Sequence, residues 1–160
     1  MVRIEVFGEG VRFPCRGISR KKIREIAAAA AGFLELDNSL VTVVIADDAY
    51  IRAINSRYRG HDTPTDVLSF PGRETPFPRV TERREDIGEI YLSMDRAVGQ
   101  ADEYRVLPID EIKRLIVHGM LHLVGYDHER SRRDKVEMER KEEEILRKMT
   151  SSPPVPPSPQ

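Results

Sequence analysis

Residues 108–128 read P-I-D-E-I-K-R-L-I-V-H-G-M-L-H-L-V-G-Y-D-H. This stretch predicts a helix over about 108–124, and its apolar residues lie on nearly every side of that helix. They are Ile112, Leu115, Ile116, Val117, Leu121, Leu123 and Val124. A helix that is apolar all round belongs in a protein core, so the sequence predicts a buried central helix.

Three of the chain's four histidines fall within this stretch. His118 and His122 are four residues apart, so both rings project from one side of the helix, one turn apart. Gly125 allows the helix to end in a left-handed turn that can carry His128 back to the same ion. Three neutral imidazoles suit zinc and leave one position open for water or substrate. The spacing therefore predicts one Zn²⁺ per chain, of the catalytic rather than the structural kind.

The alternative is that these are ordinary core or surface histidines. A buried imidazole without a partner is costly, whereas a metal-bound one is satisfied. The pattern H-x-x-x-H-x-x-G-x-x-H also resembles the ligand frame of the metzincin proteases. Those enzymes carry a Glu general base directly after the first His, and this chain has Gly119 there. The spacing thus favours a metal site and disfavours a peptidase.

The remaining sequence predicts strands and helices in alternation. Alternating or continuous apolar runs predict strands at 2–7, 40–46, 67–70 and 87–93. Helical spacing and the N-cap residues Ser19, Asp47 or Asp48, and Ser131 predict helices at about 19–34, 48–57, 95–104 and 131–149. Prolines and charges predict a surface loop over 72–86. The predicted fold is α+β (α/β-like), a small mixed four-stranded sheet packed with about five helices.

Composition narrows the class of protein. With 160 residues, 39% hydrophobic and 33% charged, the chain predicts one globular domain over 1–150, followed by a disordered Pro-rich tail over 151–160. Cys15 is the only cysteine, which excludes an intramolecular disulfide and a thiolate-rich metal site. No apolar run reaches the roughly 20 residues of a membrane span, and the start lacks a signal-peptide core. We therefore expect a cytoplasmic protein with no membrane partner.

The net charge of −1 gives no overall attraction to nucleic acid. Residues 52–84 nevertheless hold seven Arg against four acidic residues. That local excess is typical either of a phosphate-attracting patch or of a charged mobile loop, and the sequence leaves both interpretations open.

Three segments together resemble a known family. They are H-G-M-L-H-L-V-G-Y-D-H at 118–128, N-S-R-Y-R-G-H-D-T-P-T-D-V-L-S-F at 55–70, and G-E-I-Y-L-S at 88–93. They are similar to the signatures of the YbeY family, bacterial endoribonucleases of ribosomal RNA maturation. The resemblance spans about 2–149, and Glu89 stands where the family more commonly has Asp.

The resemblance implies an α+β metalloprotein with a zinc site at His118, His122 and His128. It implies cleavage of single-stranded RNA, maturation of the 3′ end of 16S rRNA, and ribosome quality control. The partners implied are single-stranded small-subunit rRNA and the ribosome or its proteins. The family's functional arginine carries over to Arg59, in Y-R-G-H-D. A guanidinium can bind two oxygens of a phosphodiester transition state, although a solvated loop arginine is the commoner case.

Several roles stay open at this point. The general base is Asp62, Asp66 or Asp127, or no protein base is needed, and Asp127 is also a candidate to orient a ligand imidazole. His61 is a surface residue or a substrate contact. The charges over 130–148 predict a solvated helix face. The alternative functions are a zinc peptidase and a ribosome-associated binding protein in which a zinc ion with four protein ligands is structural.

Overall fold

The computed structural model describes residues 1–72 and 85–151. The elements in chain order are β1 (Arg3–Glu9), α1 (Arg20–Phe33), β2 (Ser39–Ala46), α2 (Asp48–Arg59), β3 (Val67–Pro71), β4 (Glu85–Ser93), α3 (Met94–Tyr104), α4 (Pro108–Leu123) and α5 (Arg132–Ser151). Every predicted strand and helix is confirmed, and each bound lies within two residues of its expected place.

The four strands form one mixed sheet in the order β1-β2-β4-β3. β1, β2 and β4 are parallel, and β3 pairs antiparallel with β4 at the edge of the sheet. Two apolar clusters lie on opposite faces of this sheet, because neighbouring residues of a strand point to opposite sides. Val43 of β2 belongs to the larger cluster, with α1, α3, α4 and α5, and Val44 to the smaller one, with α2. The fold is α+β, as predicted.

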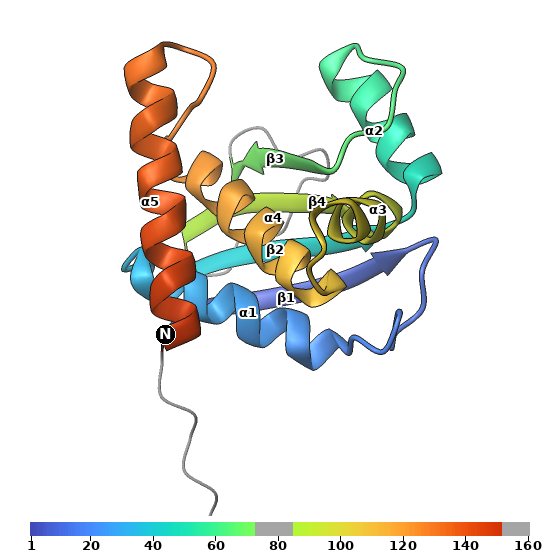
Figure 1. Cartoon of the computed structure of the whole chain (residues 1–160), viewed down its shortest axis with the longest axis horizontal. Helices are drawn as coiled ribbons and strands as arrows, with labels where there is room; N and C mark the ends of the chain where they lie inside the picture. The colour runs from blue at the N-terminus through green and yellow to red at the C-terminus, as the bar shows by residue number, and fades with distance from the viewer. Residues whose placement is uncertain (73–84, 152–160) are drawn as a thin grey trace, which may run out of the picture.

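The central helix is α4, which crosses one face of the sheet with α1 and α3 on the same side (Figure 1). Its residues Ile112, Ile116 and Met120 are fully buried. Alanines of α1 such as Ala27 and Ala30, also fully buried, leave room for the larger side chains of the core. Each fully buried Ile or Leu contributes roughly 1.5–3 kcal/mol, so α4 is held in place mainly by apolar burial. The predicted buried helix is confirmed.

Polar caps fix where the helices begin and end. The hydroxyl of Ser19 accepts from Lys22 N–H, and the carboxylate of Asp47 accepts from Tyr50 N–H. Gly60, at φ 74°, ends α2 in a left-handed conformation. The sequence predicted the end of this helix near residue 57, with Arg59 in a loop. That prediction was wrong, since Arg59 is the last residue of α2 and is therefore held by a helix.

Two predictions concern residues outside the described ranges. The surface loop over 72–86 falls mostly on 73–84, and the tail falls on 152–160 apart from Ser151, which ends α5. The strand β4 already begins at Glu85, so the loop was predicted to extend two residues too far. Across the described residues, every helix is too short or too polar to span a bilayer.

Candidate metal centre

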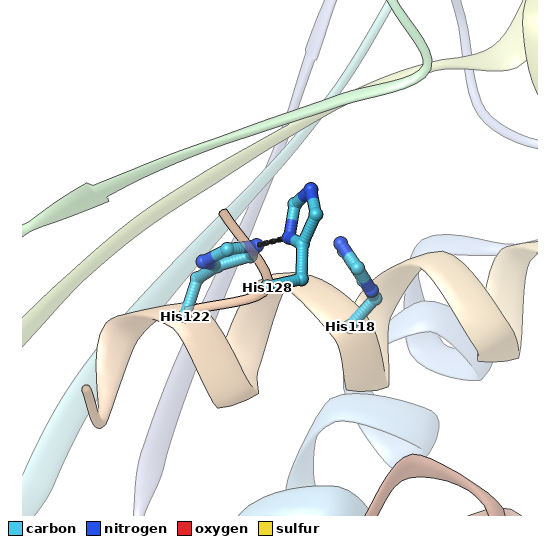
Figure 2. A group of neighbouring side chains, drawn as sticks. All are labelled: His118, His122 and His128. Atoms are coloured by element: carbon cyan, nitrogen blue, oxygen red, sulfur yellow. Dashed lines mark hydrogen bonds between the residues drawn. The ribbon is translucent and has the colours of Figure 1, made fainter. Parts of the chain in front are cut away.

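The three predicted ligands converge on one point. His118 and His122 project from α4, and His128 returns from the segment after it, across the turn at Gly125, where φ is 105° (Figure 2). One ring nitrogen from each histidine lies within 4.8 Å of the corresponding nitrogen of the other two. The ring centroids are 4.9–5.5 Å apart. The helical spacing and the glycine thus produce the cluster that the sequence predicted.

The donor set fits a metal ion. His122 Nε2 and His128 Nδ1 are 3.2 Å apart, and two nitrogens on a tetrahedral zinc, each at about 2.0–2.1 Å, are about 3.3–3.4 Å apart. Burial, followed by the neighbouring His118 and His128, lowers the pKa of His122, which favours the neutral ring that binds metal. Among residues 1–72 and 85–151, no carboxylate or thiol joins these three histidines as a fourth ligand.

A carboxylate from α5 lies beside one of the rings. Glu142 Oε2 lies 3.2 Å from Nδ1 of His118, and the Glu142 side chain is only 12% exposed. An ionised carboxylate only accepts hydrogen bonds, so this contact suits a His118 ring that carries its proton on Nδ1. The prediction that 130–148 forms a solvated charged face was therefore wrong at Glu142.

The histidines and Arg59 line a single cleft of about 700 Å³. Arg59 Nη2 donates to the Ser69 carbonyl at 2.7 Å, and its guanidinium lies 4.7 Å from the centre of the Phe70 ring. Both contacts come from the edge strand β3. A hydrogen bond and a cation–π contact hold the guanidinium in place, although the Arg59 side chain remains exposed to solvent.

Ser69 of β3 contacts both Arg59 of α2 and the histidine-bearing helix α4. Its hydroxyl donates to the Gly119 carbonyl on α4 at 3.0 Å, while its own carbonyl accepts from Arg59. Gly119 permits this close approach, because a Cβ there would lie 2.9 Å from Ile90 Cγ2 and 3.1 Å from Ser69 Oγ. Arg59, about sixty residues before the histidines in the chain, is thus brought to them through β3.

The three candidate bases lie in different environments. Asp66 and Asp127 line the cleft, and Asp62 is not among its lining residues. Asp62 instead binds Arg52 through two hydrogen bonds of 2.9 and 3.1 Å, which with the Arg52 charge lower its pKa. Asp127 accepts from Glu129 N–H, and the carboxylate within hydrogen-bond distance of a ring nitrogen of the cluster is Glu142.

His61 also lines the cleft, and sequence reasoning missed two of its neighbours there, Asn55 and Arg114. Asn55 is buried, and its Nδ2 donates to the Thr63 carbonyl at 2.8 Å, which anchors the loop that carries His61. A signal for Arg114 was available, because it stands four residues before His118 on the same helix face. A signal for Asn55 was also available. It stands four residues after Ile51, on the buried face of α2, where a polar side chain is unusual.

Comparisons with known proteins place most of this chain in one family. The family model described as Endoribonuclease YbeY matches residues 16–150. A relative called endoribonuclease YbeY, from Persephonella marina, is 39% identical over 136 residues, which cover 85% of this chain and 87% of the relative. A relative of the same name from Aquifex aeolicus is 38% identical over 143 residues, or 89% and 91% of the two chains.

A third relative of that name, from a Roseiflexus species, is 48% identical over 109 residues, covering 67% of this chain and 68% of its own. The solution structure of TM1509 from Thermotoga maritima matches with a TM-score of 0.57 and 26% identity over 98% of this chain and 99% of that one. The family model spans most of the chain, and the Persephonella and Aquifex relatives each match more than four fifths of it, so the chain belongs to the endoribonuclease YbeY family.

Proposed function

We propose that this protein is a zinc-dependent, single-strand-specific endoribonuclease of the cytoplasm. Its substrate is small-subunit rRNA, with a role in 16S 3′-end maturation and ribosome quality control in contact with the ribosome or its proteins. The observation that carries the proposal is that Arg59 and the three imidazoles line one open cleft. The relatives are named endoribonucleases, and the preference for single strands and for rRNA rests on the family resemblance.

The histidines His118, His122 and His128 would hold the ion, which when bound supplies a Lewis acid and lowers the pKa of coordinated water. Arg59 binds the scissile phosphodiester and neutralises the charge that develops on its oxygens. A guanidinium has five N–H donors, so Arg59 keeps its bond to Ser69 while binding a phosphate. Because that bond and the Phe70 ring already orient Arg59, less side-chain entropy is lost on binding.

The acid–base role falls to a residue of the cleft or to none. Asp66 and Asp127 line it and are the remaining candidates, because Asp62 is engaged by Arg52 elsewhere. Asp127 accepts from Glu129 N–H through Oδ1, and its Oδ2 lies 3.6 Å from Arg130 Nε. Asp66 accepts from Val67 N–H through Oδ1, so its Oδ2 is the better placed of the two to accept a proton.

A peptidase is disfavoured by two features of the same cleft. Gly119 occupies the place of the metzincin Glu, and even a Cβ there would meet Ile90 and Ser69 closer than van der Waals contact allows. Metalloproteases of that kind would also need room for an extended peptide beside an edge strand. On β3, Arg59 binds the Ser69 carbonyl and Asp66 accepts from Val67 N–H, so side chains of the protein occupy that edge.

The structural-zinc alternative requires four protein ligands. The three-histidine group has no fourth one in the described chain, and its cleft is open to solvent. We therefore expect cleavage of single-stranded RNA that stops on chelation and returns with zinc. Purified protein incubated with single-stranded RNA, duplex RNA and casein, with and without chelator, tests this. Cleavage that resists chelation, or casein as the only substrate, would contradict the proposal.

Substitution of Arg59 tests RNA cleavage independently of metal binding. Arg59→Ala removes a charge-assisted contact that strengthens in the transition state, at a cost of about 3 kcal/mol, or on the order of a hundredfold in rate. Arg59→Lys should recover part of that rate, because an ammonium lacks the two-pronged geometry.

The assay is single-turnover cleavage of single-stranded RNA, with zinc content measured on the same samples. Arg57→Ala is the matched control, since Arg57 is also exposed near the end of α2 but does not line the cleft. Unchanged cleavage in Arg59→Ala would remove Arg59 from the mechanism, and lost zinc would mean that its role is structural.

A further inference from the structure

A row of charged side chains runs along α4 toward the histidines. Glu111, Arg114 and His118 are spaced three and four residues apart, which places them on one face of the helix. Arg114 Nε donates a hydrogen bond to Glu111 Oε1. The Glu111 side chain is 1% exposed, so this end of the row lies in the core.

The row continues onto α5 through Glu142. Glu142 lies between Met138 and Ile145 on the buried face of α5, at positions four and three residues from them, and both neighbours are 1% exposed. A carboxylate in an apolar stripe is costly unless it is paired. Its two oxygens have separate partners, since Oε1 lies 3.6 Å from Arg114 Nη1 and Oε2 lies 3.2 Å from His118 Nδ1.

We propose that Glu142, held by Arg114, is a positioning residue that fixes the His118 ring and its tautomer for metal binding. The inference rests on the proposed metal site and assigns to α5 a part in it. Arg114 pairs with Glu142 from one side and Glu111 holds Arg114, which favours the carboxylate orientation that faces the imidazole. With Nδ1 bonded to Glu142, the lone pair of His118 lies on Nε2, toward the other two histidines.

The contact with Glu142 matters because a neutral imidazole has two tautomers. A neutral histidine exchanges between two tautomers, and only one of them leaves Nε2 free to bind an ion. An acceptor fixed at Nδ1 removes that exchange and raises the basicity of the ligand. The other two rings are placed differently: His122 Nε2 and His128 Nδ1 face each other at 3.2 Å, and His128 Nε2 lies 3.8 Å from the exposed carboxylate of Glu129, beyond hydrogen-bond distance.

The first test measures zinc affinity by competition with a chelator of known affinity. Glu142→Ala should bind zinc about 10–100-fold more weakly, the usual effect of removing a partner of a ligand histidine. Glu142→Gln should lose less, because its amide oxygen still accepts from Nδ1 without the charge. Glu143→Gln, which makes the same change at an exposed neighbour on α5, should stay within about twofold of the wild type.

The second test uses the ring ¹⁵N resonances of His118 in zinc-free protein, which report the tautomer directly. The wild type should hold the proton on Nδ1, and Glu142→Ala should shift it toward Nε2. This readout separates positioning from packing, since a cavity alone does not choose a tautomer. It also applies to the wild type if Glu142→Ala does not fold, and a proton on Nε2 in the wild type overturns the inference.

The outcomes distinguish this inference from the proposed function. If the wild type binds no zinc, the proposed metal enzyme fails, and this inference fails with it. If the wild type binds zinc and Glu142→Ala binds it equally well, only the role of Glu142 is refuted. Neither readout requires RNA cleavage, so a wrong substrate leaves the test intact.

Discussion

Replacing Gly119 by alanine tests how closely α4 is packed against β3 and β4. A glycine within a helix normally costs about 1 kcal/mol relative to alanine, so the substitution should stabilise α4 if space allowed it. The space is absent, because the new Cβ would lie 2.9 Å from Ile90 Cγ2 and 3.1 Å from Ser69 Oγ. Carbon atoms in contact are ordinarily about 3.5–4.0 Å apart, so the helix and the sheet must separate.

The net effect follows from three terms. Overpacking a well-filled core costs about 1–3 kcal/mol. Separation also weakens the hydrogen bond from Ser69 Oγ to the Gly119 carbonyl, which contributes about 0.5–1.5 kcal/mol. Against these stands the propensity gain of about 1 kcal/mol. We expect Gly119→Ala to lower stability by about 0.5–3.5 kcal/mol, or Tm by roughly 1–14 °C for a chain of this length.

The assay is thermal and denaturant unfolding of zinc-free protein, followed by zinc titration. Gly99→Ala is the control, because Gly99 lies within α3 and a Cβ there meets nothing within 4 Å, so that variant should be more stable by about 1 kcal/mol. Zinc affinity should fall in Gly119→Ala alone, since His118 is its neighbour on α4. If both substitutions stabilise equally, the packing argument is wrong.

Three further predictions concern the metal site and the loop after α2. His118→Ala, His122→Ala and His128→Ala should each lose stoichiometric zinc, measured by elemental analysis after dialysis, and full retention in all three would refute the site. Zinc at a hundred times its Kd should add about 2.7 kcal/mol and raise Tm by roughly 5–10 °C, and a Tm that ignores chelator would contradict this. Arg52 lowers the pKa of Asp62, first by hydrogen bonding and then by charge, so this pair adds stability above the ordinary Asp pKa and loses it as pH falls through the lowered value. The stability difference between wild type and Asp62→Asn should therefore shrink toward pH 3 and in high salt, and a difference that grows there would refute the linkage.

The sequence predicted the local structure because its signals are local. Ser19 and Asp47 accept the hydrogen bonds that their positions predicted, each from the residue three later. The uninterrupted apolar run of β2 predicted a strand buried on both faces, and all eight of its residues are buried. The histidine spacing predicted the cluster for the same reason, since His118, His122 and the turn at Gly125 lie within one helix and its end.

Local sequence signals could not predict which distant segments pair with one another. Strand order depends on which faces pack together, and nothing in the residues of β3 alone states that it pairs with β4 at the sheet edge beside α4. That placement is what brings Arg59 to the histidines, through Ser69. Only the family resemblance selected Arg59 beforehand, because a lone arginine after a helix is ordinarily a solvated charge.

The buried position of Glu142 could have been predicted from the sequence. In the charged run of 130–148, alternation of sign masks the apolar positions Met138 and Ile145, which mark the face that meets the core. Glu142 falls between them on that face, so a carboxylate there needed a partner of opposite charge or a donor. Arg114 and His118 lie one turn apart on α4 and supply both. A charged residue in register with buried apolar neighbours is thus a signal of a site, and the same charge out of register, as at Glu143, is a solvated one.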